Sequence, residues 1–530
     1  MSARLAISAV REIRAIGKLA VLAGVAMAGL TSSVHAAAPS GDQKPAAAKL
    51  PSAGGATEQQ PIDVGSRKQL LIDRRLLASS KNIALRMNPP AKMGPVLLPD
   101  KPWESLGIGF CVSVLEDGGQ YKMWYLAENK TSSLRYCYCY ARSQDGVTWE
   151  KPNLGLIEYQ GSKQNNIALT GVVETTVFLD PVAPAEARFK TVSAMHWPDP
   201  KEAGLYVHTS PDGIHWKMSD TRVLPLLPDT ANQAFYDARL KKYVANIRVW
   251  APMRKVGRVE MDDITKPWPF DKTVKPYYIW GEDKIAVPSH EVPIVFGYDE
   301  RDPVPSDHYN AACVQYPWAD QAYFLFPSAY RHFPEPPIGK YGNDGLVDIQ
   351  MATSCDGIKW ARPSREPYVA LGTQDEVDCG SLYMAVGMLR RGGKIFQYYN
   401  GYQVSHGTPE NLESRIGSIC RLQQRLDGFV SADAAFEGGE FTTPPLVFSG
   451  SRLVLNVNLS ALGVCKVEIL DRQGHALPGF ALAQSDEIGG NHVEKTVSWK
   501  GKSDLGSLRG RAIRLRVVLR AGKLFAFQFP

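Results

Sequence analysis

The chain has 530 residues, of which 44% are hydrophobic and 22% charged, the balance of an ordinary globular protein. The formal net charge is +6, but the basic residues are scattered and form no run with interleaved aromatic residues, so nucleic acid is not an expected partner. Aromatic residues make up 10% of the chain, and 46 Gly and 37 Pro mark many turns, which favours a β-rich fold. The length predicts two or more domains.

The first segment, residues 1–36, predicts an export signal. A basic start is followed by an apolar stretch of 12 residues at 19–30, and small residues precede a cleavage point after Ala36. The stretch is too short for an ordinary membrane span, and the alternative is a short membrane anchor. We therefore expect a secreted or periplasmic protein with no stable membrane insertion after the signal is cleaved. Residues 37–60, rich in Ala, Pro, Gly and Gln, predict a disordered linker.

A turn motif with the pattern Ser-x-Asp-Gly-x-x-Trp occurs three times, at 143–149, 210–216 and 354–360. The first two copies are 67 residues apart and the last two 144, about twice that period. Looser matches at Asp263 and Asp427 complete a series of five units of roughly 70 residues. A repeat of this length is typical of a β-propeller.

Each unit also has a short strand rich in aromatic and β-branched residues, bounded by turn residues. These strands predict four-stranded antiparallel blades, so the expected fold is all-β, with a five-bladed β-propeller over residues 61–435. The five aromatic strands are at 121–128, 188–197, 243–250, 323–330 and 395–402.

The repeated turn motif has a structural interpretation. Gly accepts a positive φ and Asp bonds nearby backbone N–H groups, so Asp-Gly favours a tight turn, and the Trp would pack between neighbouring blades. Because the motif occurs once per blade, Asp145, Asp212 and Asp356 would lie at equivalent places on the outer part of the ring. The alternative, that these three acids form one active site, is therefore disfavoured.

Residues 436–530 have a different pattern, in which apolar and polar residues alternate over short runs such as "RLVLNVNLS" and "RAIRLRVVLR". This pattern predicts a C-terminal antiparallel β-sandwich. It is either an accessory domain packed on the propeller or a carbohydrate-binding domain. Residues 61–95 are expected to add a strand that fastens one of the two domains.

A carboxylate precedes each aromatic strand by 14 to 18 residues, where the innermost strand of a blade would reach one mouth of the channel. Several acids at one mouth would raise one another's pKa, and two of them suffice to cleave a glycosidic bond, as acid and as nucleophile or base. We therefore expect Glu104, Asp229 and Asp378 to be catalytic. The alternative for each is a carboxylate that caps a turn.

Polar and aromatic residues near these acids fit a sugar, because amides bond hydroxyl groups and aromatic faces stack on sugar rings. The eight Cys form no C-x-x-C pair and no His lies at metal-ligand spacing, so we expect no metal, no cofactor and mostly buried Cys. The expected substrate-binding residues are Trp103, Asn166, Glu174, Asp180, Arg248, Asp307, Tyr309 and Asn310.

The stretches "QYKMWYLAE", "ARSQDGVTWEKPNLG", "SDHYNAACVQY", "MATSCDGIKWARP" and "RLDGFVS" resemble a group of secreted bacterial proteins described as glycosyl hydrolase family 32-like. The resemblance covers about residues 63 to 530 and implies a five-bladed propeller with an oligo- or polysaccharide substrate. The family's nucleophile motif has no match here, and Glu104 is the nearest acid in the corresponding stretch "PWESLGIGF". The family's Arg-Asp-Pro motif corresponds to "FLDP", where Asp180 is either the transition-state stabiliser or a turn residue.

The resulting interpretation is a secreted glycoside hydrolase that uses the carboxylates at the mouth. Because the family's catalytic motifs are absent, the alternative is a non-catalytic glycan-binding or scaffold propeller. Two further alternatives are a glycoside phosphorylase, which would depend on phosphate, and a sialidase-like enzyme. The latter would need an arginine cluster at the mouth, including Arg248 and Arg331.

Overall fold

The computed structural model describes residues 60–129, 134–195, 204–225, 228–251, 253–270, 292–333, 345–406 and 417–530. The predicted export signal and nearly all of the predicted linker lie outside the described residues. Within those ranges the fold is all-β, and each helix is a 3-10 turn of three residues. No helix in the described part of the chain is long and apolar enough to cross a membrane.

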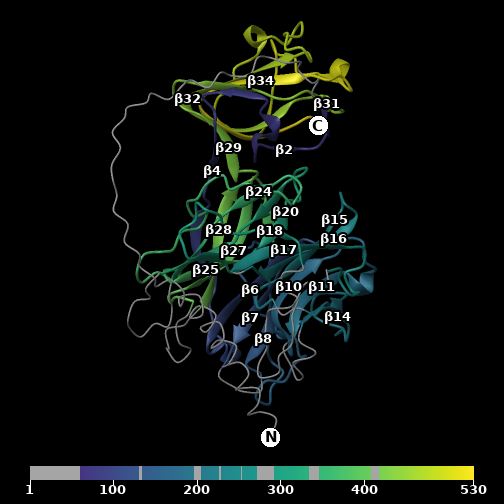
Figure 1. The fold of residues 1–530 in the computed structure, drawn as a ribbon, viewed down its shortest axis with the longest axis vertical. Helices are drawn as coiled ribbons and strands as arrows, with labels where there is room; N and C mark the ends of the chain where they lie inside the picture. Colours follow the sequence, from purple (N-terminus) through teal and green to yellow (C-terminus); the bar gives the residue numbers. More distant parts are fainter. Residues whose placement is uncertain are drawn as a thin grey trace, which may run out of the picture.

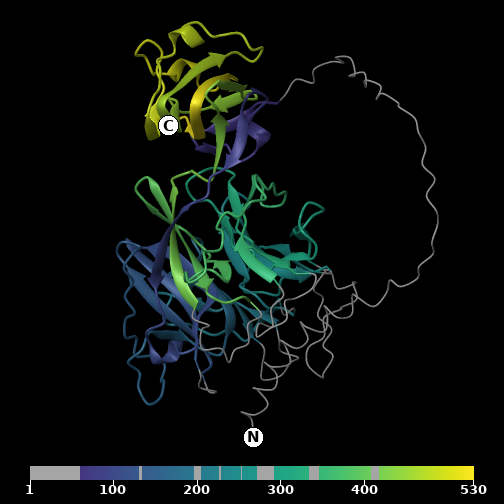
Figure 2. The ribbon, with the colours of Figure 1, turned by 90° about the vertical axis from the view of Figure 1, so that its left-hand side faces the viewer.

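The strands form two bodies, a larger one and a smaller C-terminal one (Figures 1 and 2). In the larger body, successive units of the chain form successive sheets in a propeller-like arrangement. The first unit contains β6 (Gly107–Asp117), β7 (Gln120–Glu128), β8 (Tyr136–Ser143) and β9 (Ile167–Leu169). The second unit contains β10 (Val173–Leu179), β11 (Phe189–Met195), β12 (Gly204–Tyr206), β13 (Thr209–Ser210) and β14 (Arg222–Leu224). The third unit contains β15 (Gln233–Asp237), β16 (Lys242–Trp250), β17 (Arg254–Met261) and β18 (Ile294–Phe296).

The fourth and fifth units do not form two separate sheets. The fourth unit contains β19 (Ser306–His308), β20 (Cys313–Gln315), β21 (Tyr323–Leu325), β22 (Ser328–His332), β23 (Gly345–Ile349) and β24 (Ala352–Ser354). The fifth unit contains β25 (Ser381–Met384), β26 (Leu389–Arg391), β27 (Lys394–Tyr402) and β28 (Gly417–Arg425), joined by β5 (Ala91–Leu97) from the start of the described chain.

Among the described residues, the larger body therefore has four sheets of four or more strands and one three-stranded sheet, β20-β21-β24, where five separate four-stranded blades are predicted. The difference has a local cause. Pro327 separates β21 from β22, and proline cannot donate to a strand ladder, so the fourth unit splits into two three-stranded parts. One part, β19-β22-β23, then joins the fifth unit through the parallel pair Val347 and Ser381, which makes a single sheet of eight strands.

The three turn motifs fold in the same way. In each, the Ser Oγ accepts from the Gly backbone N–H at 2.8–2.9 Å, and one Asp Oδ1 accepts from two backbone N–H groups at 2.8 Å. Gly146, Gly213 and Gly357 all have φ between 70° and 80°, as the turn requires. The structural interpretation of Asp145, Asp212 and Asp356 is confirmed.

Each unit is bonded to the unit before it, and the first unit is bonded to the fifth. Three of these bonds end on the Gly carbonyl of a turn motif, which explains why the motif repeats once per unit. The bonds are Tyr398 Oη to Gly146 O (2.7 Å), Trp124 Nε1 to Gly213 O (2.6 Å), Trp268 N to Val223 O (2.7 Å), Arg258 Nη1 to Gly357 O (3.2 Å) and Tyr316 Oη to Asp427 Oδ1 (2.8 Å).

The ends of the larger body meet through β5, which pairs antiparallel with β28. Ile419 of β28 lies opposite Leu97 of β5, so the earliest propeller strand of the chain completes the last unit. The bridge between Ser113 of β6 and Val386 adds a second link between the first and fifth units. Pairing between the first and last strands of the larger body thus joins its two ends.

The smaller body has its own apolar core, formed by residues such as Leu453, Val467 and Phe529. A two-sheet sandwich is predicted here, whereas most of its strands belong to one eight-stranded sheet. Register shifts in the long strands, as between Leu459 and Val464, let one sheet curl over its own core. The sheet contains β2 (Gln69–Leu70), β3 (Ser79–Lys81), β4 (Ala84–Met87), β29 (Val430–Ala434), β30 (Gly439–Thr442), β32 (Val454–Leu470), β33 (Asn491–Thr496) and β34 (Arg514–Gln528). A separate parallel pair joins β1 (Ile62–Gly65) to β31 (Leu446–Phe448).

Asp427 lies at the seam between the two bodies. Its buried carboxylate accepts from Lys68 Nζ at 2.9 Å and from Asn456 Nδ2 at 3.0 Å, in addition to Tyr316. Lys68 and Asn456 belong to the chain segments of the smaller body, and Tyr316 to the larger one. This shared carboxylate, together with β2, β3 and β4, ties the start of the described chain to both bodies.

Candidate functional site

The first strands of successive units begin at one mouth of the larger body, and two of them bulge there. Opposite β7, the register of β6 shifts between Ile108 and Val112, and opposite β11, that of β10 shifts between Val173 and Thr176. Bulges turn side chains away from their regular direction. The residues displaced in this way include Phe110 in the first unit and Glu174 in the second.

Two carboxylates at this mouth have an uncommon backbone conformation. Glu174 has a φ of 49° and Asp229 a φ of 50°, the left-handed region that few residues other than Gly adopt. The segment after Asp229 is held by Asn232, whose Nδ2 donates to Thr230 O at 2.7 Å and whose Oδ1 accepts from Arg248 N at 3.0 Å. Strained conformations that the surrounding structure maintains are concentrated at functional sites.

Glu174 and Asp229 are hydrogen-bonded to each other. Burial raises the pKa of Glu174 well above its ordinary value of 4.5, and the neighbouring Asp229 raises it further. Asp229 is also ion-paired, because Arg248 Nη1 lies 3.1 Å from its Oδ2. The two carboxyl groups therefore have different environments: Glu174 is set up to hold a proton, and Asp229 is bound by a cation.

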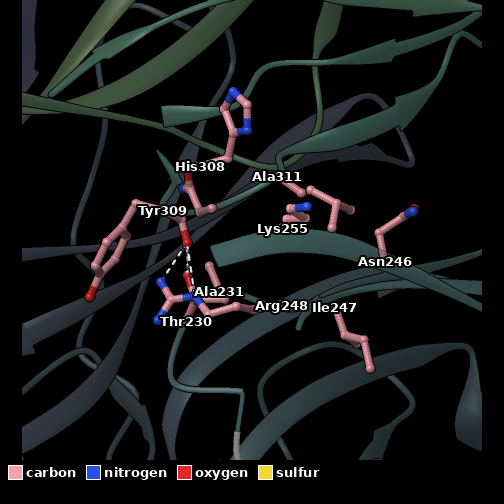
Figure 3. Close-up of a pocket in the computed structure, with 11 residues that line it drawn as sticks. Thr230, Ala231, Asn246, Ile247, Arg248, Lys255, His308, Tyr309 and Ala311 are labelled. Atoms are coloured by element: carbon pink, nitrogen blue, oxygen red, sulfur yellow. Dashed lines mark hydrogen bonds between the residues drawn. The ribbon is translucent and has the colours of Figure 1, made fainter. Parts of the chain in front are cut away.

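Arg248 is fixed from several sides. Its Nε donates to the backbone carbonyl of Tyr309 at 3.1 Å, and its Nη2 donates to the same oxygen (Figure 3). Its guanidinium lies 4.2 Å from the centre of the Tyr309 ring, a cation–π contact. Burial raises the pKa of Tyr309, and Asp229 adds to this effect. Arg248 and Tyr309 thus hold the third and fourth units together beside the carboxyl pair.

A small cavity lies next to this group, and Figure 3 shows the residues around it. Its volume of about 10 Å³ is enough for roughly one water molecule. A sugar ring does not fit, so a glycan would have to bind outside it, at the mouth. The lining residues are Thr230, Ala231, Asn246, Ile247, Arg248, Lys255, Val256, His308, Tyr309, Asn310 and Ala311.

A second charged group lies behind Tyr309. Asp307 is buried, and its Oδ2 lies 2.7 Å from Arg254 Nη1 and 3.3 Å from His332 Nε2. Burial alone would raise the pKa of Asp307, but Arg254 and His332 outweigh it and lower the pKa to about 2. The Arg254 guanidinium lies 5.2 Å from the Tyr309 ring centre, so Tyr309 contacts both arginines.

Aromatic side chains from the first, fourth and fifth units complete the mouth. The Phe110 ring centre is 5.0 Å from that of Tyr383 and 5.5 Å from that of Tyr309. Tyr383 Oη and His406 Nδ1 are hydrogen-bonded at 2.6 Å, and the His406 ring lies 4.3 Å from Tyr309. Tyr309 and Tyr383 are buried, whereas Phe110 and His406 are partly exposed.

Three of the predicted residues lie together elsewhere in the first unit. Glu104 is buried and ion-paired with Lys151 at 2.8 Å, and its other oxygen accepts from Tyr125 Oη at 2.7 Å. Trp103 Nε1 donates to Asn166 Oδ1 at 3.0 Å, and Asn166 Nδ2 donates to Tyr125 Oη at 2.8 Å. All the hydrogen-bond partners described for Glu104 belong to this group or to the adjacent backbone, which is the arrangement of a structural ion pair.

Asp378 and Asp180 are also ion-paired with lysines. Asp378 Oδ2 lies 2.7 Å from Lys92 Nζ and accepts from Tyr399 Oη at 2.6 Å. Asp180 lies in the turn after β10, where its Oδ2 is 2.5 Å from Lys190 Nζ and 2.8 Å from Tyr243 Oη. Its contacts fit the turn interpretation. Like Glu104, these two acids are each paired with a lysine, whereas Glu174 and Asp229 contact each other.

The structure therefore brings together five of the predicted residues: Glu174, Asp229, Arg248, Asp307 and Tyr309. Asn310 is near them, at the cavity, where its Oδ1 accepts from Ser328 N at 3.2 Å. Phe110, Arg254, His332 and His406 also belong to this group, and no sequence motif singles them out. They share no position either: Phe110 lies in the first strand of its unit, Arg254 begins β17, His332 ends β22 and His406 follows β27.

Arg248 and Arg254 lie together against Tyr309, but Arg331, the other arginine expected in a sialidase-like cluster, does not join them. Arg331 pairs with Asp348 at 2.6 Å, and in β22 its side chain alternates with those of Tyr330 and His332, which face His406 and Asp307. Arg248 and Arg331 are therefore on different sides of this strand. No group of three or more potential metal ligands occurs in the described ranges.

No family model matches this chain, and no curated protein sequence matches it. Its fold is similar to those of solved glycoside hydrolases and related proteins. An N-acetylgalactosamine deacetylase from F. plautii, in complex with blood group B trisaccharide, is 15% identical over 65% of this chain and 96% of that chain, with a TM-score of 0.41. A thermostable family-43 glycoside hydrolase is 12% identical over 62% and 93% (TM-score 0.40), and the exo-inulinase from Aspergillus awamori is 12% identical over 84% and 99% (TM-score 0.39).

Proposed function

We propose that the protein is a glycoside hydrolase whose acid and nucleophile are Glu174 and Asp229. The observation that carries this proposal is the hydrogen-bonded carboxyl pair, in which only one member is ion-paired. Glycosidic bond cleavage needs two carboxyl groups in opposite protonation states. Burial keeps the proton on Glu174, while Arg248 is ion-paired with Asp229.

In the first step, Glu174 gives its proton to the glycosidic oxygen as the bond from that oxygen to the anomeric carbon breaks. Asp229 Oδ attacks the anomeric carbon and forms a covalent glycosyl ester. Glu174, now a carboxylate, takes a proton from water, whose oxygen then displaces Asp229 and restores both groups. The two groups are in contact and lack the gap in which an inverting enzyme holds its water molecule, which favours the retaining course; they would separate to about 5 Å as the sugar enters between them.

Arg248 and Tyr309 have positioning roles in this scheme. Arg248 Nη1 holds Asp229, and the two other bonds of Arg248 to Tyr309 O keep that nitrogen in place. Asp307 and Arg254 support Tyr309 from the far side. Glu104 and Asp378 have structural roles, which replaces the catalytic assignment that their sequence positions suggest.

Three finer features belong to the same proposal. The eight-stranded sheet is taken as two fused units, so that five units form the ring, which the five bonds between consecutive units support. The curled C-terminal sheet is taken as a sandwich-like accessory domain. The protein is secreted or periplasmic and acts on an oligo- or polysaccharide, for which the basic and apolar pattern of residues 1–36 and the mouth chemistry are the support.

The test is hydrolysis of a panel of oligosaccharides and aryl glycosides by the full chain and by E174Q and D229N variants. We expect turnover by the wild-type protein, with retention at the anomeric carbon, and loss in both variants. Turnover that both variants retain would exclude the assignment. Glycan binding without turnover would support the non-catalytic alternative, and turnover only in the presence of phosphate would indicate a phosphorylase.

A further inference from the structure

Phe110 occupies in the first unit the place that Glu174 occupies in the second. Both residues lie near the start of the first strand of their unit, β6 and β10, and both lie within a break in the register of that strand. The bulge in β6 places the three residues 109–111 opposite Leu126 alone. At Gly109 an added Cβ would be 2.6 Å from a Leu126 methyl carbon, so this bulge requires Gly beside Phe110.

The strand of Phe110 lies next to the carboxyl pair. Ser113 Oγ of β6 accepts from Val177 N of β10 at 2.9 Å, so the strand of Phe110 is bonded to the strand that begins beside Glu174. The Phe110 ring itself meets Tyr309, whose carbonyl holds Arg248.

The ring of Phe110 is the accessible part of an aromatic surface. Its plane is tilted by only 33° from that of Tyr383, while Tyr309 meets it edge-on at 85°. Tyr309 and Tyr383 are 6% and 1% exposed, whereas Phe110 is half-buried. Two buried rings therefore fix the orientation of a third ring that a ligand can reach.

The two arginines that contact Tyr309 are already bound to acids. Arg248 pairs with Asp229 at 3.1 Å, and Arg254 pairs with Asp307 at 2.7 Å. A carboxylate or sulfate group on a sugar would have to displace one of these acids and would also face the acids themselves. A neutral sugar binds without displacing either acid and without charge repulsion, and its apolar C–H face can pack on an aromatic ring.

We propose that Phe110 is a substrate-binding residue on which the sugar ring at the scissile bond stacks, and that the mouth takes a neutral sugar. This inference rests on the proposed function, since it places the sugar beside Glu174 and Asp229. In the first unit an apolar ring replaces the acid that the second and third units supply. Phe110 then selects the sugar, and the carboxyl pair performs the reaction.

The experiment compares F110A, F110L and F110Y with the wild-type protein and with F436A. Phe436 is a matched control, because it is 73% exposed and lies in the smaller body. The probes are para-nitrophenyl glycosides of neutral hexoses and pentoses, with the glucuronide and galacturonide matched to the glucoside and galactoside. Both binding, by calorimetry, and turnover are measured, and thermal unfolding identifies any variant that does not fold.

We expect F110A and F110L to raise KM or Kd for a neutral glycoside roughly tenfold, with a smaller change in kcat, because apolar contact area is lost. F110Y keeps the ring and should bind nearly as well as the wild-type protein, as should F436A. Since leucine maintains the apolar volume, a loss in F110L separates stacking from packing.

The inference is overturned if F110A and F436A bind equally well, if none of the neutral glycosides binds, or if the uronides bind more tightly than their neutral matches. Its failure is distinguishable from that of the proposed function. Binding that depends on Phe110 without any turnover would reject the hydrolase and retain the stacking residue. Turnover that depends on Glu174 but not on Phe110 would do the opposite.

Discussion

Two groups of carboxylates in this protein have opposite surroundings. Glu104, Asp180 and Asp378 each have a lysine at 2.5–2.8 Å, and all three are buried. Glu174 is hydrogen-bonded to another acid, Asp229, at a mouth where several units meet. An acid with its own lysine fastens local structure, whereas an acid that faces a second acid can hold a proton.

The comparison shows that the partner, rather than the residue type or its spacing, decides the role. The backbone conformation differs in part as well. Glu174 and Asp229 have a positive φ, whereas Glu104, Asp180 and Asp378 do not. A positive φ is not confined to the pair, because the lysine-bound Asp427 has a φ of 62°.

The largest expected effect is on activity in the carboxyl pair. We expect E174Q and D229N to lower kcat/KM by about 10²–10⁴-fold, because each removes a proton-transfer or nucleophilic group. The measurement is hydrolysis of whichever glycoside the wild-type protein turns over. The matched control is D262N, an exposed acid of the third unit whose side chain is 88% accessible. If E174Q were as active as D262N, Glu174 would have no role in the reaction.

The pH dependence tests the same pair without removing it. Because the pKa of Glu174 is raised in the folded protein, its contribution to stability is full below the ordinary pKa and is lost as the pH rises through the raised value. Above that raised value kcat/KM should also fall by about tenfold per pH unit, as the acid loses its proton. The checks are the pH–rate profile and the pH dependence of unfolding by urea. In E174Q the corresponding part of the stability curve should disappear, and a curve identical to that of the wild-type protein would contradict the assignment.

Substitution of a lysine-bound acid should lower the stability of the protein without directly lowering its activity. E104Q leaves Lys151, whose side chain is 8% exposed, without its buried counter-charge, and we expect a loss of about 3 kcal/mol in the free energy of unfolding. Urea denaturation measures this loss. Activity per folded molecule should stay at the wild-type level. A second variant, E104Q with K151M, should recover part of the stability, since it also removes the buried lysine charge, whose other acidic partner is the more exposed Asp100 at 2.7 Å.

The smallest expected effect is at a turn motif. D145A removes an acceptor of two backbone N–H bonds in a partly exposed turn, and we expect a loss of about 1 kcal/mol, as for the loss of a helix cap. Thermal unfolding monitors the change, and hydrolysis should be unaffected. If D145A abolished activity with little effect on stability, the three motif acids would need a catalytic interpretation after all.

The repeating architecture could be predicted from the sequence because its signals are local. The turn motif, the aromatic strands and the period of the repeat each depend on a few neighbouring residues, and the structure confirms the all-β fold and the role of Asp145, Asp212 and Asp356. The sheet count could not be predicted, because it depends on a single long-range pair between Val347 and Ser381 and on where Pro327 interrupts a ladder.

The site was only partly predictable for the same reason. The sequence identifies acids near the start of each unit, but not which of them find a lysine. Lys151 lies 47 positions after Glu104, and Lys92 lies 286 positions before Asp378. The first pair needs the folding of one whole unit, and the second forms only when β5 joins the fifth unit. Phe110 belongs to no sequence motif, and the direction of its side chain depends on a bulge that Gly109 permits.

The pairing of β5 with β28 has a consequence for the order of events during synthesis. Leu97 leaves the ribosome early, yet its partner Ile419 follows 322 positions later, so the ring has an open edge for most of translation. Contacts of such large sequence separation form slowly, and an unpaired edge strand invites association with other chains. The nascent chain is therefore protected from self-association at β5 only after β28 has been synthesised and has paired with it. A chain shortened at either end should accumulate as aggregates rather than as a smaller propeller.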